Sequence, residues 1–369
     1  MKKFHFWAAA LSGLLLFSCS KEEAIDESAA PGEPARLVVQ LSGDASVKAT
    51  LPTAANESKI AKGIVFVFRG TGLNPVLDGK ASFDFSSTTT NPVSVEITAG
   101  ASRHVYVVAN IADESDFSHV TTLSDLYNLT NKYQLTAMRT GTNLGMSGFV
   151  RDINASTAKP SSPATATVQL YFLGSQVHVD WDITQVQTAF PGFTITGAYL
   201  LNVKSQTDYF SAPSTYLTAN VNSYLRGKSD IGTFTGSYLP AVPATNTYDV
   251  ALAMANLSTD KGFDKNSFYV TENNSAAPTI VALEGTYNGT VYYYPIVING
   301  DQNGSGTGGG TNAGDKSSTV ARSNIYNVKA IIKGLGNTDP YEPLVKGMIN
   351  VTITAAAWNP VIAIDQQFD

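Results

Sequence analysis

The sequence has very little cysteine, since Cys19 is the only one in 369 residues. A single thiol cannot form a disulfide within the chain, and a metal site built from several thiolates is excluded as well. The folded part must therefore gain its stability from packing and strand pairing.

Charged residues are scarce too, at 15% of the chain, compared with about a quarter in an average protein. The net charge is −6 at pH 7, so no basic surface is expected. Nucleic acid is therefore not expected as a partner, because binding to its phosphates requires clustered Lys and Arg.

The chain contains only four histidines, and they are scattered. The best metal candidate is the stretch HVDWD, in which His178, Asp180 and Asp182 alternate along a predicted strand. Alternate strand residues lie about 7 Å apart, so three of them cannot easily converge on an ion at ligand distances of about 2 Å. We therefore expect a solvent-facing polar stripe opposite Val179 and Trp181.

Other catalytic motifs are absent or incomplete. The loop GGGTNAGDKSS, residues 308–318, differs from a phosphate-binding loop because Asp315 puts a negative charge where phosphate would lie. No G-x-S-x-G motif occurs, so a serine hydrolase has no support. We expect no enzyme, no cofactor and no metal, although a carboxylate-based glycosidase site would leave no local motif.

The N-terminus has the features of an export signal. Lys2 and Lys3 precede the apolar stretch FWAAALSGLLLF, which predicts a signal peptide over residues 1–18. Leu16 and Ser18 then precede Cys19 in the pattern of bacterial lipoproteins, whose cysteine carries lipid. The alternative is ordinary signal cleavage near a chance cysteine. Residues 20–34 are small and acidic, which is typical of a tether.

Most of the remaining chain consists of short apolar runs separated by turn residues. VSVEITAG alternates, and HVYVVANI is apolar on both faces, as a central strand would be. Asn288 and Gly289 join two further runs and predict a hairpin. Leucines at near-helical spacing in residues 121–133 predict a helix.

This pattern predicts an all-β fold with minor helix, in which two antiparallel β-sandwiches follow each other in the chain. The Ser, Thr, Ala and Pro-rich residues 154–167 separate two blocks of strand pattern. We expect the domain boundary close to this segment.

The first predicted strand lies in ARLVVQLSGDASVKATLP, residues 35–52. Leu37, Val39 and Leu41 fall on one face, and their burial is worth about 5 to 8 kcal/mol before ordering costs. Lys48 follows among small residues that are open to a protease. The chain thus has a well-formed first strand attached by a cleavable linker.

Several segments occur in an order that resembles one known family, the major fimbrial subunits or fimbrillins of Bacteroidales type V pili. The resemblance extends over nearly the whole chain, and the order of the segments is its specific part. The segments are FSCSKE, LVVQL with a basic site after it, ESKIAKGIVFVF, VYVVANI, SFYVTENNS, YYYPIVI, RSNIYNVKAIIKGLGNTDP and VTITAAAW.

The resemblance implies an assembly mechanism. In that family the subunit is exported as a lipoprotein, and a trypsin-like protease cuts after a basic residue and removes the first strand. The C-terminal strand of another subunit fills the groove, and the chains add head to tail. Here the cut would fall between Lys48 and Ala49, where most relatives have Arg before the cut. A cut at Arg36 would leave the strand attached.

The resemblance also implies a donor strand at the C-terminus. After Pro360, the residues Val361, Ile362, Ala363 and Ile364 form a short apolar run that fits this role. The alternative is a final core strand of the C-terminal domain.

The resemblance further implies transthyretin-like sandwiches and a surface location, first in the outer membrane and then in an extracellular fimbrium. Expected partners are other copies of the chain, accessory pilus subunits, the processing protease, the outer membrane through the lipid, and receptors on host or bacterial surfaces. The expected parts are the signal peptide 1–18, a lipidated propeptide 19–48, an N-terminal sandwich 49–168 and a C-terminal sandwich 169–369 with the donor strand at about 360–369.

Two alternatives to an adhesive stalk subunit stay open. One is a monomeric surface lipoprotein that binds glycan or protein and keeps LVVQL as a permanent strand. The other is a tip or accessory pilus component without a usable donor strand.

Overall fold

The computed structural model describes most of the chain between residues 32 and 357. The described ranges are 32–42, 59–72, 74–85, 91–111, 113–140, 143–210, 223–229, 234–240, 245–254, 267–273, 277–298, 306–307, 319–345 and 347–357. Cys19, Lys48, Ala49, the loop 308–318 and the predicted donor residues 361–364 lie outside these ranges.

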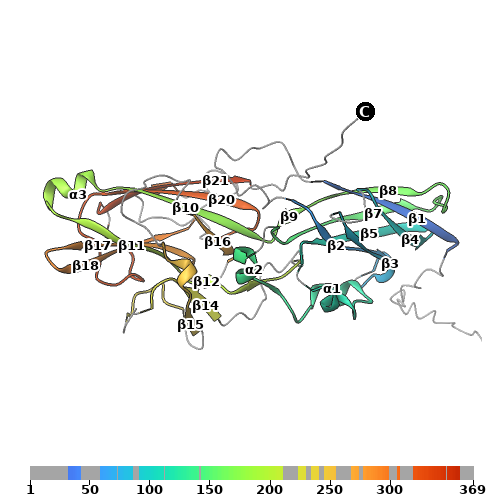
Figure 1. Cartoon of the computed structure of the whole chain (residues 1–369), viewed down its shortest axis with the longest axis horizontal. Helices are drawn as coiled ribbons and strands as arrows, with labels where there is room; N and C mark the ends of the chain where they lie inside the picture. Colours follow the sequence, from blue (N-terminus) through green and yellow to red (C-terminus); the bar gives the residue numbers. More distant parts are fainter. Residues whose placement is uncertain are drawn as a thin grey trace, which may run out of the picture.

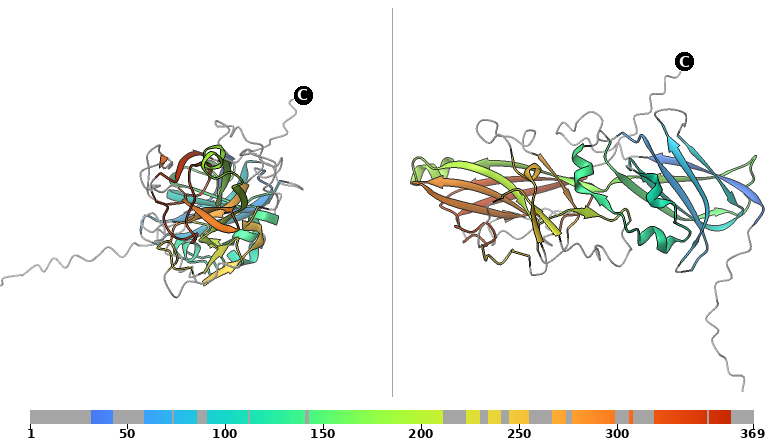
Figure 2. Two further views of the ribbon diagram at one scale, coloured as in Figure 1. Left: turned by 90° about the vertical axis from the view of Figure 1, so that its left-hand side faces the viewer. Right: turned by 60° about the horizontal axis from the view of Figure 1, so that its bottom comes forward.

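The molecule is elongated, with two strand-rich halves in a row along its long axis (Figure 1). The right-hand view of Figure 2 shows the same two halves in a row, and the left-hand view looks along the long axis. Strands dominate both halves and helices are few and short, so the predicted all-β fold of two sandwiches is confirmed.

The N-terminal half contains a three-stranded and a five-stranded sheet. The smaller sheet has the order β4 (Val93–Thr98), β1 (Pro34–Ser42) and β8 (Ala164–Gln169). The larger one has the order β3 (Val76–Asp84), β2 (Lys62–Arg69), β5 (Gly100–Ala109), β7 (Met146–Ala155) and β9 (Tyr171–Phe172). Short elements between β5 and β7 are the 3-10 helix η1 (Glu114–Phe117), α1 (Leu123–Tyr127), β6 (Tyr133–Gln134) and α2 (Leu135–Thr140).

The C-terminal half is built from three sheets. The five-stranded sheet contains β16 (Ser267–Thr271), β10 (Gly174–Asp182), β20 (Asn324–Ile332), β21 (Ile349–Ala357) and β19 (Gly306–Thr307). A three-stranded sheet contains β11 (Thr194–Leu201), β17 (Ile280–Tyr287) and β18 (Thr290–Val297), and a smaller one β12 (Val203–Lys204), β14 (Ser223–Arg226) and β15 (Thr245–Tyr248). The remaining elements are α3 (Thr184–Ala189), β13 (Gln206–Thr207) and the 3-10 helix η2 (Val250–Leu252).

Local sequence signals explain several of these elements. Asn288 and Gly289 form the tight turn between β17 and β18, and both have positive φ, at 49° and 77°. Positive φ at both central residues is what such hairpins require. Helix α1 begins within the predicted segment 121–133, with Thr122 as its N-cap and Asp125 completing a capping box. It ends at Tyr127, and Tyr133 already belongs to β6, so the predicted helix was too long.

The two halves are joined by direct contacts. Strand β6 of the N-terminal half pairs with β13 of the C-terminal half. Near it, the Ser147 hydroxyl of β7 donates to the carbonyl oxygen of Tyr209 at 2.6 Å. The Arg322 guanidinium of the C-terminal half donates to the Ser147 hydroxyl at 3.4 Å. One cluster of buried apolar side chains runs through both halves. The molecule therefore has a continuous core across the junction.

The structure corrects the expected polar stripe on β10. His178 is buried, and its imidazole is hydrogen-bonded to Gln176 at 3.0 Å. The predicted solvent-facing position was therefore wrong for His178, whereas Asp180 and Asp182 are half-buried. Strand β10 lies between β16 and β20 in its sheet. No group of His, Cys, Asp and Glu among the described residues could hold a metal ion.

Two details of the strand arrangement differ from the sequence pattern. The segment 154–167 joins β7 to β8 inside the N-terminal half, and Phe172 in β9 still pairs with β7. Four strand pairs are parallel, including β1 with β8 and β10 with β20, although most of the pairs are antiparallel. Parallel neighbours are far apart in the sequence, so local pattern could not reveal them.

Candidate functional site

The candidate site is the slot in the N-terminal half that β1 occupies. Strand β1 lies between β4 and β8 (Figure 1). It pairs antiparallel with β4 from Pro34 to Val39 and parallel with β8 from Leu37 to Ser42. Strand β1 is the only strand with which β4 and β8 form a ladder in the described part of the chain.

The inner face of β1 belongs to the hydrophobic core. Leu37, Val39 and Leu41 are each 0% exposed, and so is Ala35. The alternation that was read from the sequence therefore gives a fully buried face, with Ala35 as a fourth member that sequence reasoning did not single out. Removal of β1 would leave an apolar trough of the length of this strand.

The outer face of β1 is held much more loosely. The Arg36 guanidinium donates to a carboxylate oxygen of Glu96 in β4 at 3.0 Å. Their side chains are 41% and 69% exposed, so water screens this ion pair. The inner face therefore dominates the free energy that holds β1 in place.

The C-terminal end of β4 is fixed by a buried ion pair. The Asp78 carboxylate in β3 accepts hydrogen bonds from Arg103 Nε at 2.8 Å and from the Thr98 hydroxyl at 2.7 Å. Asp78 also accepts from the Thr98 N–H at 3.1 Å, and Arg103 donates to the Thr98 carbonyl oxygen at 2.9 Å. The side chains of Asp78 and Arg103 are only 3% and 4% exposed. This cluster ties β4 to β3 and β5 without using β1.

Just before the N-terminal end of β4, the side chain of Asn91 contacts the backbone of β1. The Asn91 amide accepts from the Leu41 N–H and donates to the Leu41 carbonyl oxygen, both at 3.0 Å. The ladder places Val39 opposite Val93, so Leu41 lies opposite Asn91 two residues further on. Sequence reasoning missed Asn91, because Asn before Pro signals only a turn.

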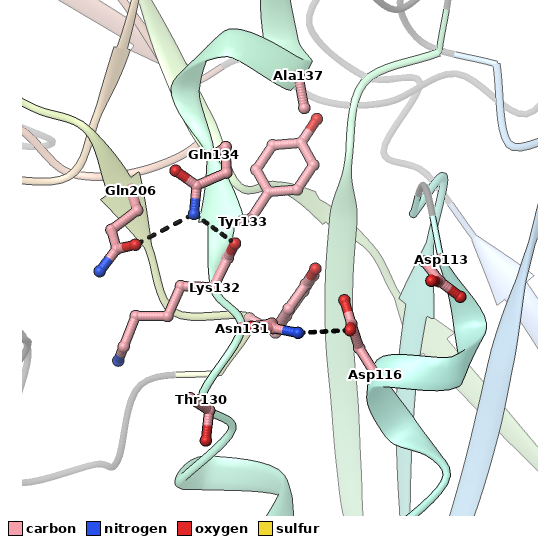
Figure 3. Close-up of a pocket in the computed structure, with 10 residues that line it drawn as sticks. Asp113, Asp116, Thr130, Asn131, Lys132, Tyr133, Gln134, Ala137 and Gln206 are labelled. Atoms are coloured by element: carbon pink, nitrogen blue, oxygen red, sulfur yellow. Dashed lines mark hydrogen bonds between the residues drawn. The ribbon is translucent and has the colours of Figure 1, made fainter.

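A polar pocket lies near the junction of the two halves, with a volume of about 340 Å³ (Figure 3). Side chains that line the pocket are hydrogen-bonded to one another: Asn131 donates to Asp116 at 2.6 Å, and Gln134 donates to Gln206 at 3.1 Å. The hydrogen bond from the backbone N–H of Ser115 lowers the pKa of Asp113. Among the described residues that line the pocket, no nucleophile is paired with a base. These residues therefore do not form a catalytic arrangement.

The predicted site residues are thus placed only in part. The structure brings Leu37, Val39 and Leu41 together in the core, whereas Cys19, Lys48, Ala49 and residues 361–364 lie outside the described ranges. No helix in those ranges is long and apolar enough to cross a membrane.

The fold and the slot that β1 occupies together define a class of protein. In this class two β-sandwiches follow each other in the chain, and strand β1 completes the first of them. Two family models match in the same order. Residues 35–172 match the major fimbrial subunit protein (FimA), and residues 199–358 match the C-terminal domain of FimA-like major fimbrial subunit proteins. The chain belongs to this fimbrillin family of Bacteroidales.

Solved structures show the same two-domain fold. A fimbrilin from Porphyromonas gingivalis has 19% identity and a TM-score of 0.68, over 89% of this chain and 99% of its own. A Bacteroides eggerthii protein with an assumed role in cell adhesion has 26% identity and a TM-score of 0.65, over 90% of this chain and 98% of its own. A tip fimbrial protein from P. gingivalis has 14% identity and a TM-score of 0.54, over 88% of this chain and 100% of its own. The search of curated proteins found no match.

Proposed function

We propose that this protein is a non-enzymatic pilin subunit that polymerises head to tail into adhesive surface fimbriae. A trypsin-like protease cuts between Lys48 and Ala49, β1 leaves, and the C-terminal strand of another copy takes its place. One observation carries the proposal: an N-terminal strand with four fully buried side chains is the middle strand of its sheet. A sheet that loses such a strand exposes backbone groups on two edges, and strand addition satisfies them again.

The position of the basic residues supports the cleavage step. Lys48 is the only Lys or Arg between Arg36 and Lys59. A protease that cuts after basic residues therefore has one position in this segment at which it separates β1 from the body. Arg36 is protected within β1, because the backbone on both sides of it pairs with β4.

The donor is proposed to be the run Val361 to Ile364. In one alternation, Ile362 and Ile364 face into the trough and Asp365 faces outward, which avoids burying a carboxylate. The surface that is given differs from the surface that receives, and such contacts build open filaments when they do not close into rings.

Limited trypsin digestion of the purified precursor tests the cleavage step. We expect N-terminal sequencing to find Ala49 as the new first residue and sizing to show polymers. Lys48→Gln should block both, whereas the matched variant Lys59→Gln should process and polymerise normally. A cut protein that stays monomeric would contradict polymerisation and support a monomeric surface lipoprotein.

Deletion of residues 361–369 tests the donor. The truncated and cut subunit should stay folded but form no polymer. Global unfolding of the truncated chain would instead show that the tail is a core strand of the C-terminal half.

Export is proposed to proceed through a lipid on Cys19, which anchors the precursor in the outer membrane. Cys19→Ser should move the precursor from the membrane fraction to the soluble fraction of the cells. An unchanged distribution would contradict the lipid anchor and leave the cleavage step unaffected.

A further inference from the structure

Asn91 makes a contact that depends on the backbone of β1 and not on its sequence. Both of its hydrogen bonds end on the main chain of Leu41, one on the N–H and one on the carbonyl oxygen. The side-chain amide therefore acts as a peptide group would in an antiparallel ladder. Any non-proline residue at the same place offers the same two atoms.

The contact lies where the backbone ladder to β4 has stopped. The pairing of β1 with β4 ends at Val39, and only β8 continues beside the strand as far as Ser42. Without Asn91, the Leu41 N–H and carbonyl oxygen would lack their partners on the β4 side. Unpaired backbone groups next to a core are costly, so this one side chain has a large effect on the end of the strand.

We propose that Asn91 is a backbone-binding residue of the slot, which holds β1 in the precursor and then holds the strand that replaces it. The second half of this inference rests on the proposed strand exchange. When β1 leaves, the amide loses both partners and presents a donor and an acceptor to the incoming strand. The residue that arrives opposite Asn91 must carry an N–H, so a register that places Pro360 there is excluded.

The test uses full-length protein that has been cut after Lys48. A labelled peptide of residues 33–45 displaces the cut strand, and its affinity is measured by fluorescence anisotropy. Asn91→Ala should weaken binding by about tenfold, as expected for the loss of two backbone contacts. Asn91→Asp retains the acceptor for the Leu41 N–H but places a second oxygen against the Leu41 carbonyl oxygen, so it should weaken binding at least as much as Asn91→Ala. Unfolding of the uncut variants checks that each still folds.

Coupling between the two partners separates direct contact from a general loss of stability. N-methylation of Leu41 in the peptide removes the N–H that donates a hydrogen bond to the side-chain oxygen of Asn91. It should weaken binding to the native slot several-fold more than to the Asn91→Ala slot. An N-methyl group on Gln40 is the matched control and should cause equal losses in both proteins. If N-methylation of Leu41 also weakened binding equally in the native and the Asn91→Ala proteins, a direct contact between Asn91 and Leu41 would be contradicted.

A second peptide, residues 357–369, tests whether the contact passes to the donor. We expect its affinity to fall with Asn91→Ala by a similar factor. If this peptide binds but is insensitive to Asn91→Ala, the inference fails and strand exchange stands. If it does not bind while the β1 peptide does, strand exchange by this tail fails.

Discussion

At the scale of single residues, burial decides which ion pairs hold the slot together. The pair of Asp78 with Arg103 is almost fully buried and carries the end of β4, whereas the pair of Arg36 with Glu96 lies in solvent. A buried charge that loses its partner costs far more than an exposed one. One pair fixes the C-terminal end of β4 and the other joins the exposed sides of β1 and β4, so the two pairs differ mainly in burial.

We therefore expect Asp78→Asn to destabilise the precursor by about 3 to 5 kcal/mol, because the Arg103 charge stays buried without its partner. Glu96→Gln should cost less than about 1 kcal/mol. Urea unfolding of the two variants at neutral pH measures both values. Equal losses would show that the Asp78 cluster does not hold β4.

The capping box of α1 gives a prediction for pH. Hydrogen bonds from Thr121 and Thr122 lower the pKa of Asp125 to about 2, below the value of about 3.9 for a free carboxyl. The folded form therefore binds its proton less readily than the unfolded form. The resulting stability is present above pH 4 or so and is lost as the pH falls towards about 2.

An NMR titration of the Asp125 carboxyl should place its midpoint near 2, and Asp125→Asn should remove this part of the acid sensitivity. Asp125 is only partly buried and its hydrogen bonds are to Thr121 and Thr122, so the effect should be local to the start of α1 and small for the whole chain. A midpoint near 4 would contradict the capping contact.

At the scale of elements, β1 is an interior strand whose two faces have different roles. Its inner face fills the core, and its outer face meets solvent. The inner side chains are the fully buried part of β1. In the proposed strand exchange, the backbone contacts of β4, β8 and Asn91 would determine which kind of strand can enter. In the proposed assembly, such a strand must hold the precursor closed during export and still be replaceable afterwards.

Leu37→Ala should destabilise the precursor by about 2 to 5 kcal/mol, because it opens a cavity in the core. Its neighbour Arg36 points outward, so Arg36→Ala should have an effect below about 1 kcal/mol. Denaturant unfolding of the uncut chains compares the two. If the two substitutions cost the same, β1 is not anchored through its inner face.

At the scale of the whole molecule, the two halves have separate tasks in the proposed assembly. The slot lies in the N-terminal half, and the proposed donor follows β21 of the C-terminal half. The halves share a core and are joined by the pairing of β6 with β13 and by the hydrogen bond from the Ser147 hydroxyl to the Tyr209 carbonyl oxygen. In the proposed filament, the shared core would connect the strand that a subunit receives with the strand that it gives.

Head-to-tail growth predicts how defective subunits act in mixtures. Cut subunits that lack residues 361–369 can receive a strand but cannot give one, so a small fraction of them should shorten the filaments of intact cut subunits. Uncut subunits with the same deletion can do neither and should have no effect. Sedimentation or light scattering measures filament length. If the cut and the uncut deletion variants shortened the filaments equally, the proposal that each subunit has a donor end and an acceptor end would be contradicted.

The sequence by itself determined the all-β class, the hairpin at Asn288 and Gly289, the start of α1, and the alternating face of β1. All of these depend on neighbours within a few residues, whose spacing and turn chemistry fix the local backbone. Only the tertiary structure decided that β1 is parallel to β8, that His178 is buried in a central strand, and that Asp78 and Asn91 hold the slot. These features join residues that are far apart in the chain, and a single sequence contains no local signal for such pairings.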